Sequence, residues 1–259
     1  MARPLPRTHP DVRGFDRNAA TYERGRPDYP PAAVRHLARV LHLGPGTIVV
    51  ELGSGTGKFT RALAPVGAAR IAIEPMAGMR RVFREAVPDV PVLDGTAEAI
   101  PLPDGFADAV VCAQSFHWFR PRRALREIAR VLRPRGALAL IWNTRDEGVA
   151  WSRAISRIVA RYRWMSPKSR DARWRPVFLA GGHPFGPLHA RTFSHVQRGA
   201  IETFVERTLS VSVIANLPPA QQRAVADEVR AVFRNDPAVR GRTTVDLPYS
   251  TDVYWAFRR

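Results

Sequence analysis

The chain has 259 residues, 45% of them hydrophobic and 24% charged, a balance typical of globular proteins that excludes a disordered or fibrous chain. No apolar run reaches the roughly 20 residues of a membrane-spanning helix, and residues 1–15 contain no apolar stretch typical of a signal peptide. The single cysteine, Cys112, excludes an internal disulfide or a thiolate metal cluster. We therefore expect a cytoplasmic protein. The formal net charge is +17, but nearly all of the 40 basic residues are arginine and 23 residues are proline, a skew that we attribute to genomic base composition and interpret as a solvated surface.

The first half of the chain alternates predicted helices and strands. A helix is expected from Pro30–Pro31 to Gly44, where proline and glycine mark its two ends. A β-branched run without alternation at 47–52 predicts a strand that is buried on both faces. Further strands are expected at 70–74, 90–93, 107–113 and 137–142, with helices over 59–64, from Met76 to Pro88 and from Pro121 to Pro134. Such alternation with short connections predicts a doubly wound, mostly parallel sheet with helices on both faces.

The second half is less regular, but its apolar spacing still predicts helices and strands. A helix is expected over 149–165, followed by an excursion rich in proline and glycine over 166–187. A strand at 189–196, helices at 201–213 and 218–234, and a final antiparallel strand at 249–257 complete the prediction. The α/β sheet then has seven strands.

A glycine-rich turn joins the first strand to its helix, in the sequence Glu51-Leu-Gly53-Ser-Gly55-Thr-Gly57-Lys58. Glycines at this place let the backbone approach a ligand, and the carboxyl edge of an open α/β sheet is where small molecules bind. A P-loop would need glycine at Leu52 and a hydroxyl at Phe59, and a dinucleotide fingerprint would need glycine at Lys58, so both are disfavoured. Glu74, at the end of the second strand, is placed to accept hydrogen bonds from two ribose hydroxyls, which predicts a nucleoside ligand.

This glycine turn, together with the acid at Glu51, resembles motif I of the class I S-adenosylmethionine-dependent methyltransferases. Two further segments, 94–104 and 130–136, resemble that family's loop after the third strand and its turn into the fifth, so the resemblance covers residues 15–145. The segments Ser115–Phe119, Tyr22–Tyr29 and Leu247–Tyr254 are similar to its small-molecule group, which includes trans-aconitate methyltransferases. The resemblance implies a Rossmann-like methyltransferase fold with a helical cover, and S-adenosyl-L-methionine as cofactor with S-adenosyl-L-homocysteine as product.

The resemblance also implies which residues hold the cofactor: Glu51, Gly53, Ser54, Gly55, Gly57, Glu74, Pro75, Met76, Thr96, Ala97, Glu98 and Gln114. Thr96 stands where the family often has aspartate. Adenine recognition is therefore expected to rest on the backbone of Ala97 and Glu98, or on Asp94.

The implied function is transfer of a methyl group to an oxygen of a small acidic metabolite by in-line displacement, with nitrogen or carbon as the less favoured acceptor atoms. Tyr22, Tyr29, His117 and Trp118 are the expected substrate-binding residues, converging over the glycine turn with aromatic faces near the sulfonium. His117 is the candidate general base; binding of a substrate carboxylate or a structural role are the alternatives, and both are favoured over proton transfer. The other histidines have no ligand-like spacing, so no metal is assigned.

A basic segment, 151–175, carries eight arginines and lysines against a single acidic residue. Three of them, Arg153, Arg157 and Arg161, form one helical stripe that we interpret as a solvated face. Drawing in an anionic substrate and contacting RNA are the alternatives, so an RNA methyltransferase is the second candidate and a non-catalytic nucleoside-binding regulator the third. We expect one domain over 1–259, with N-terminal cap helices at 1–46, a cofactor-binding core at 47–145, a basic insertion or cover at 146–187, and C-terminal strands and helices at 188–259.

Overall fold

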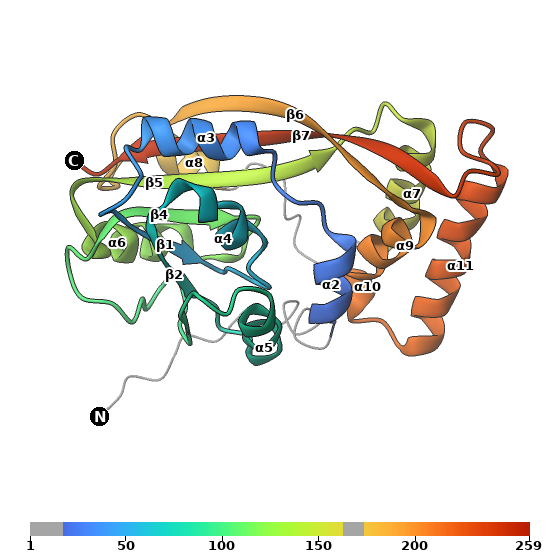
Figure 1. Ribbon diagram of the computed structural model, residues 1–259, viewed down its shortest axis with the longest axis horizontal. Helices are drawn as coiled ribbons and strands as arrows, with labels where there is room; N and C mark the ends of the chain where they lie inside the picture. Colours follow the sequence, from blue (N-terminus) through green and yellow to red (C-terminus); the bar gives the residue numbers. More distant parts are fainter. Residues whose placement is uncertain (1–17, 163–173) are drawn as a thin grey trace.

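The computed structural model describes residues 18–162 and 174–259, and is built on one seven-stranded sheet with the strand order β3-β2-β1-β4-β5-β7-β6 (Figure 1). The strands are β1 Ile48–Leu52, β2 Ala69–Ile73, β3 Val92–Leu93, β4 Ala107–Ala113, β5 Leu132–Arg145, β6 His189–Ala200 and β7 Thr244–Phe257. The first five are parallel, and β7 runs antiparallel to both β5 and β6. The predicted doubly wound, mostly parallel sheet of seven strands is confirmed.

Successive residues of a strand point to opposite sides of the sheet. Both sets are mainly apolar in the central strands, so helices cover both faces. Val50 and Leu52 pack in one apolar cluster with Leu125 and Ile128 of α6 (Pro121–Val131). Val49 packs on the other face, with residues of α3 (Pro31–Val40) and α4 (Lys58–Ala62). On that same face α5 (Ala77–Ala86) covers β2 and β3. Burial on both faces explains why these strands read as unbroken apolar runs.

A second body of helices packs beyond the sheet, at the right of Figure 1. It consists of α7 (Ala150–Ala160), α9 (Ile201–Leu209), α10 (Ser212–Ala215) and α11 (Pro219–Asn235), whose apolar cluster also takes in the first half of β7. The helix α2 (Ala19–Gly25) lies between the sheet and this body and contacts both α5 and α9. Short elements complete the described chain: the 3₁₀ turns η2 Ala64–Val66 and η3 Phe116–Trp118, and α8 Arg175–Leu179.

Several expected boundaries were wrong. The single helix expected over 201–213 is two helices, because Val211 is extended (φ −70°, ψ 130°) and the hydroxyl of Ser210 donates to the carbonyl of Arg207 (2.7 Å) and so ends α9. The third strand has only two residues, whereas the final strand begins at Thr244 and the strand from His189 extends to Ala200. The helix expected over 149–165 ends at Ala160, and its expected last residues lie outside the described part of the chain.

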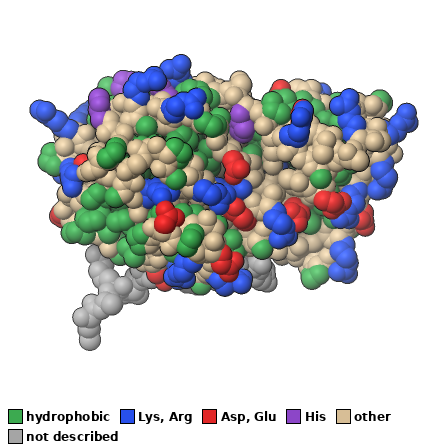
Figure 2. Space-filling view, viewed as in Figure 1, with side chains coloured by type: hydrophobic (Ala, Val, Ile, Leu, Met, Phe, Trp, Pro, Cys, Tyr) green, Lys and Arg blue, Asp and Glu red, His purple; other side chains and the backbone are tan. Residues whose placement is uncertain are grey.

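Charged side chains are interspersed on the face seen in Figure 2, where blue and red groups alternate over both the sheet and the helical body. Many arginines of the described chain have a carboxylate partner, for example Arg230, which bonds to Glu202 and Asp227. Such a surface agrees with the interpretation of the net charge as a solvated exterior. Within the described ranges, no helix is both long and apolar enough to span a bilayer.

Candidate active site

A pocket opens at the carboxyl ends of β1, β4 and β5, the edge at which doubly wound sheets bind ligands. Its floor comes from these strands and the glycine turn, and its roof from α2, the segment that follows α2, and α9. The lining residues are Tyr22, Arg26, Pro27, Tyr29, Glu51, Gly53, Ser54, Thr56, Lys58, Phe59, Ala113, Gln114, Asn143 and Arg207. The expected convergence of the N-terminal tyrosines with the glycine turn is therefore present in the structure.

The glycine turn is tied to the neighbouring strand and has no room for side chains at two of its positions. The amides of Gly53 and Ser54 both donate to the carbonyl of Ile73, at 2.8 and 3.3 Å. Gly53 has φ +64°, and a Cβ atom there would lie 2.7 Å from the Cβ of Ser115. Gly57, with φ +86°, would collide with Phe83 in the same way. Glycine is required at both positions by backbone conformation and by space.

Gly55 differs, because a Cβ atom at this position would meet nothing within 4 Å although φ is +58°. The space over the middle of the turn is thus open. Two buried hydroxyls of the same turn, Ser54 Oγ and Thr56 Oγ1, line the pocket and have no hydrogen-bond partner among the described residues; Thr96 Oγ1, in the loop after β3, is in the same state. Buried polar groups normally have partners, so an open space beside buried, unpartnered hydroxyls is a place where a polar ligand fits.

Glu74 lies directly after β2 and is buried, with both carboxylate oxygens already oriented by backbone amides. Oε2 accepts from the amide of Gly55 (2.9 Å) and Oε1 from the amide of Met76 (2.9 Å). Each carboxylate oxygen can accept more than one hydrogen bond. The side chain therefore retains acceptor capacity for a diol while its geometry is fixed by the glycine turn.

Glu51 is buried on β1, on the sheet face that α4 covers. Its Oε2 accepts a short hydrogen bond from the hydroxyl of Thr60. Burial raises the pKa of Glu51 to about 8, the Thr60 hydrogen bond opposes this shift, and the nearby charge of Glu74 adds to it. At neutral pH the side chain is largely protonated, and a cationic group placed beside it would favour ionisation.

The loop after β3 carries the expected adenine-side residues. Thr96 and Ala97 are buried, and the carbonyl of Thr96 accepts from the amide of Ala99 (3.1 Å). The carboxylate of Glu98 accepts from the amide of Arg120, at 2.6 Å, where α6 begins. The side chain of Glu98 is therefore engaged by the protein, and its backbone is the part available to a ligand. Asp94 pairs with Arg80 (3.0 Å), which also donates to the carbonyl of Glu74 (2.8 Å).

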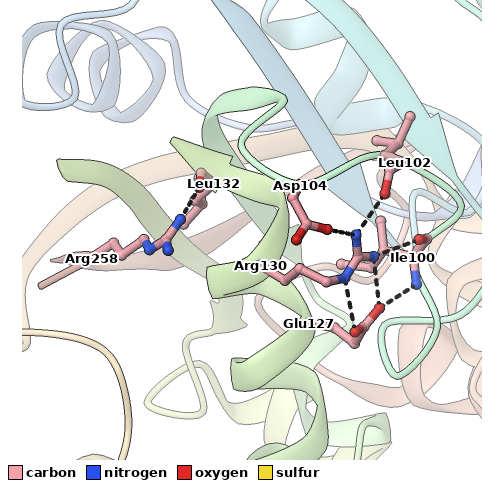
Figure 3. A network of polar contacts seen from close by, with 7 residues as sticks. All are labelled: Ile100, Leu102, Asp104, Glu127, Arg130, Leu132 and Arg258. Atoms are coloured by element: carbon pink, nitrogen blue, oxygen red, sulfur yellow. Dashed lines mark hydrogen bonds and ion pairs between the residues drawn. The ribbon is translucent and has the colours of Figure 1, made fainter. Parts of the chain in front are cut away.

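Arg130 of α6 fixes the end of this loop (Figure 3). Its guanidinium donates to the carbonyls of Leu102 and Ile100, both at 2.9 Å, and to the carboxylates of Asp104 and Glu127. The carboxylate of Glu127 in turn accepts from the amide of Ile100 (3.1 Å). Burial alone would raise the pKa of Glu127, but the hydrogen bonds from Arg130 and Ile100 outweigh it and hold that pKa below its ordinary value. The turn predicted at 130–136 thus begins with a residue that orders the loop over 100–104.

Gln114 follows β4 in an unusual conformation, with φ +57°. Its amide donates to the carbonyl of Ile141 (2.9 Å), and its side-chain nitrogen donates to the carbonyl of Asn143 (3.0 Å). A non-glycine residue in this region carries backbone strain, which is typical of functional sites. Gln114 and Asn143 both line the pocket, so the strain lies in its wall.

The structure does not bring all the expected substrate residues together. Tyr22 and Tyr29 line the pocket, and burial raises the pKa of each phenol, so both are neutral. His117 and Trp118 are absent from its described lining; they lie on η3, with their rings 5.0 Å apart. The indole nitrogen of Trp142 donates to His117 Nδ1, at 3.3 Å. This contact orients the imidazole with Nδ1 as acceptor, a structural role that the sequence had offered as an alternative.

Eight lining residues were not predicted as site residues: Arg26, Pro27, Thr56, Lys58, Phe59, Ala113, Asn143 and Arg207. Arg26 lies inside the segment Tyr22–Tyr29, where only the tyrosines were chosen. Arg207 gave no signal, because it belongs to a helix far along an arginine-rich chain. Only the packing of α9 against α2 brings it to the glycine turn.

The strand order, the glycine turn at the end of β1 and the acid after β2 together define the class I methyltransferase fold. Residues 50–140 match the family model described as a methyltransferase domain. An uncharacterized methyltransferase-like protein of Schizosaccharomyces pombe is 36% identical over 245 residues, which cover 94% of this chain and 95% of that protein. The chain therefore belongs to the class I S-adenosylmethionine-dependent methyltransferases.

Two further proteins are similar to this chain, one in the sequence of a segment and the other in fold. The malonyl-[acyl-carrier protein] O-methyltransferase of Methylococcus capsulatus is 38% identical over 110 residues, or 40% of each chain. A solved structure from Anaeromyxobacter dehalogenans, described as a candidate type II methyltransferase, has a TM-score of 0.62 at 22% identity and covers 90% of this chain and 97% of its own. The last likeness concerns the fold alone.

Proposed function

We propose that this enzyme transfers the methyl group of S-adenosylmethionine to an oxygen atom of a small acidic metabolite by in-line displacement. The observation that carries the proposal is the pocket itself, in which Arg207 and the phenols of Tyr22 and Tyr29 face the glycine turn from a roof of helices. A roofed pocket of this kind suits an acceptor small enough to be enclosed. The arginine favours an acceptor, or a part of the cofactor, that carries negative charge.

The residues around the glycine turn fit the cofactor in chemical type. Glu74 suits the ribose hydroxyls, the backbone of Thr96, Ala97 and Glu98 suits adenine, and Met76 and Pro75 lie beside that region. The carboxyl group of Glu51 and the polar groups of Gln114 suit the amino-acid end, where an ammonium would find an acidic partner. When bound, the cofactor supplies a methyl group already activated on a sulfonium.

The protein's own contribution is then to orient the acceptor and to exclude water. Alignment of two reactants can supply roughly 7 to 11 kcal/mol of the barrier. Tyr22 and Tyr29 present neutral aromatic rings in the pocket wall, and such rings attract a cation and displace water. An acceptor carboxylate is ionised at neutral pH, so transfer to it needs no general base.

His117 is assigned to binding or support, in preference to proton transfer. Its Nδ1 accepts from Trp142. Its position on η3, next to Phe119, which reaches within 3.5 Å of a Cβ placed on Gly53, supports a role in holding the floor of the site. His117→Ala should separate the roles: loss of turnover with unchanged affinity for S-adenosylhomocysteine indicates contact with the acceptor, and loss of both indicates support.

Oxygen as the methylated atom is supported by a relative. The Methylococcus capsulatus protein is by its name an O-methyltransferase, and its similar segment amounts to 40% of this chain. The chemistry agrees, because the oxygen of an ionised carboxylate is available as a nucleophile without deprotonation.

RNA methylation is less well supported by the basic segment. The tryptophans that would stack on bases are buried: Trp151 packs against Phe204 and Phe233, and Trp174 stacks on Trp142. Two of the three arginines of the predicted stripe are engaged by the protein, Arg161 with Glu228 and Arg153 with the carbonyls of Glu147 and Gly148. Trp164 lies outside the described residues.

The test is a transfer assay over cell extract with a cofactor carrying a trideuterated methyl group, read by mass spectrometry. We expect labelled small anionic products that disappear after ester hydrolysis. Label in RNA instead would support the second candidate. Calorimetric binding of S-adenosylhomocysteine without any labelled product would support the non-catalytic regulator.

A further inference from the structure

Two arginines in the pocket wall have no acidic partner among the residues that the structure describes. Arg207 is only 4% exposed and donates from Nε to the phenol oxygen of Tyr249 (2.6 Å). Arg26 donates from Nε to the hydroxyl of Ser210 (2.9 Å) and from Nη2 to its carbonyl (3.0 Å). Within the described part of the chain, neither guanidinium lies within 4.0 Å of a carboxylate oxygen. By contrast, Arg24, two residues before Arg26 and near the end of α2, pairs with Glu206 at 2.8 Å.

A buried charge without a counterion is unfavourable, and here two like charges line the same pocket. Burial lowers the pKa of Arg26, and the nearby charge of Arg207 lowers it further. Removing a charge from water is costly unless a partner of opposite charge, held in good geometry, offsets the loss of hydration. An anion between the two guanidinium groups would offset this cost, and the pocket onto which both residues open is where such an anion can enter.

The N–H donors that the two guanidinium groups leave available suit an anionic ligand in geometry as well as in charge. Among the described residues, the terminal nitrogens of Arg207 donate to no protein acceptor, since only its Nε does. Tyr249 and Tyr22 lie against the guanidinium groups, at 5.7 Å from Arg207 and 4.9 Å from Arg26, and restrict their planes. A guanidinium edge with fixed orientation matches a planar carboxylate.

We propose that Arg207, with Arg26 beside it, binds a carboxylate group of a ligand in this pocket. The proposal rests on the proposed function, because the carboxylate has two possible sources, the amino-acid end of the cofactor and the methyl acceptor. It assigns a specificity role to a residue of α9, outside the strands and loops that carry the glycine turn.

The first arm of the test measures whether the cofactor supplies the carboxylate. Calorimetry compares S-adenosylhomocysteine with 5′-methylthioadenosine, which lacks the amino-acid end. The variants are Arg207→Gln and Arg26→Gln, and Arg24→Gln is the matched control because its partner is Glu206 and it is absent from the described pocket lining. If the cofactor is the source, Arg207→Gln lowers the affinity for S-adenosylhomocysteine at least tenfold and leaves the affinity for methylthioadenosine within twofold of the wild-type value.

The second arm measures whether the acceptor supplies it. With S-adenosylhomocysteine bound, thermal stabilisation by succinate and by trans-aconitate is compared with that by succinamide, which has the same shape without the charge, and by inorganic phosphate. If the acceptor is the source, a carboxylate probe stabilises the wild-type complex and the Arg24→Gln complex but not the Arg207→Gln complex, and succinamide stabilises none.

The proposal is overturned if the arginine variants keep the wild-type ratio of S-adenosylhomocysteine to methylthioadenosine affinity and no carboxylate effect depends on Arg207. Stabilisation by phosphate alone overturns it as well. If Arg207→Gln does not fold, Arg26→Gln, which is only partly buried, carries both arms. Failure of the proposed function is separate: in that case the wild-type protein binds neither nucleoside or transfers no methyl group.

Discussion

Gly25, the last residue of α2, lies directly against the backbone of α9 at Arg207. A Cβ atom on Gly25 would stand 2.7 Å from the Cα of Arg207 and 2.8 Å from the carbonyl carbon of Glu206. Real Cβ atoms do not approach backbone so closely, and backbone cannot move aside as a side chain can. The absence of a side chain at Gly25 therefore lets the two helices meet and brings Arg26 and Arg207 to the same pocket.

The first prediction is that Gly25→Ala separates α2 from α9. Forcing a methyl group into this contact should cost about 1–3 kcal/mol of unfolding free energy, and S-adenosylhomocysteine should bind more weakly because the roof of the pocket shifts. Gly44→Ala is the matched control, since a Cβ there meets nothing within 4 Å. Urea unfolding and calorimetry measure both effects; a Gly25→Ala protein that matches the control in stability and affinity would contradict the role of this contact.

The sheet could be predicted from the sequence because its strands are buried on both faces and its helices have clear ends. The predicted strand at 107–113 coincides with β4, and the helix expected from Pro121 matches α6. The lengths of β6 and β7 could not be predicted, because these two strands pair with each other at one side of the sheet and this pairing sets which of their residues are buried. Where α9 ends also depends on a tertiary feature, because Ser210 bonds to both Arg26 and Arg207.

The site was predictable only where function imposes a local pattern. Gly53 and Gly57 need positive φ and have no space for a side chain, so the turn has a recognisable spacing. Arg207 is one of many arginines, and its distinction is that it is buried without an acidic partner among the described residues, a property of packing that the sequence does not display. The expected place of His117 over the turn also depended on packing, and the structure directs its ring to Trp142 instead.

The second prediction concerns two glycines of the same turn. Gly53→Ala and Gly55→Ala both place a side chain at positive φ, which costs about 1 kcal/mol. Gly53→Ala also collides with Ser115, whose hydroxyl is held by the carbonyl of Leu52 at 2.6 Å. We expect Gly53→Ala to lower the melting temperature by several degrees more than Gly55→Ala. Gly55→Ala, which extends into the open space, should lose affinity for S-adenosylhomocysteine with little loss of stability; equal effects on both measures would contradict this account.

The third prediction concerns the Arg130 network of Figure 3. Arg130→Met leaves the carbonyls of Ile100 and Leu102 without their donor and removes the partner of Glu127. The network is partly exposed, so we expect a loss of about 1–3 kcal/mol in stability, together with weaker nucleoside binding through the loop that contains Thr96.

Arg133→Met is the control for this prediction, because Arg133 pairs with Asp108 at the surface and does not contact the loop. Hydrogen exchange of the amides over 94–104 measures the order of the loop directly. Unchanged protection there in Arg130→Met would show that the network does not hold the loop.

The fourth prediction is that the carboxyl group of Glu51 makes the free energy of unfolding depend on pH. Its pKa is 4.5 in an unfolded chain and about 8 in the folded protein, where burial is the main cause. The folded state therefore binds more protons than the unfolded state between these values, so the contribution of Glu51 to stability is complete below pH 4.5 and is lost as the pH rises to about 8.

In Glu51→Gln this loss is absent, and the amide oxygen can still accept from Thr60. Urea unfolding at pH 5, 6.5 and 8 should show the variant gaining on the wild-type protein as the pH rises, by up to about 1.4 kcal/mol per pH unit. Glu202→Gln is the control without a pH trend in this range, because the hydrogen bond from Arg230 lowers the pKa of Glu202 below its ordinary 4.5 and its contribution to stability is lost only as the pH falls below that value. A constant difference between wild type and Glu51→Gln across this range would mean that Glu51 is ionised in the folded protein.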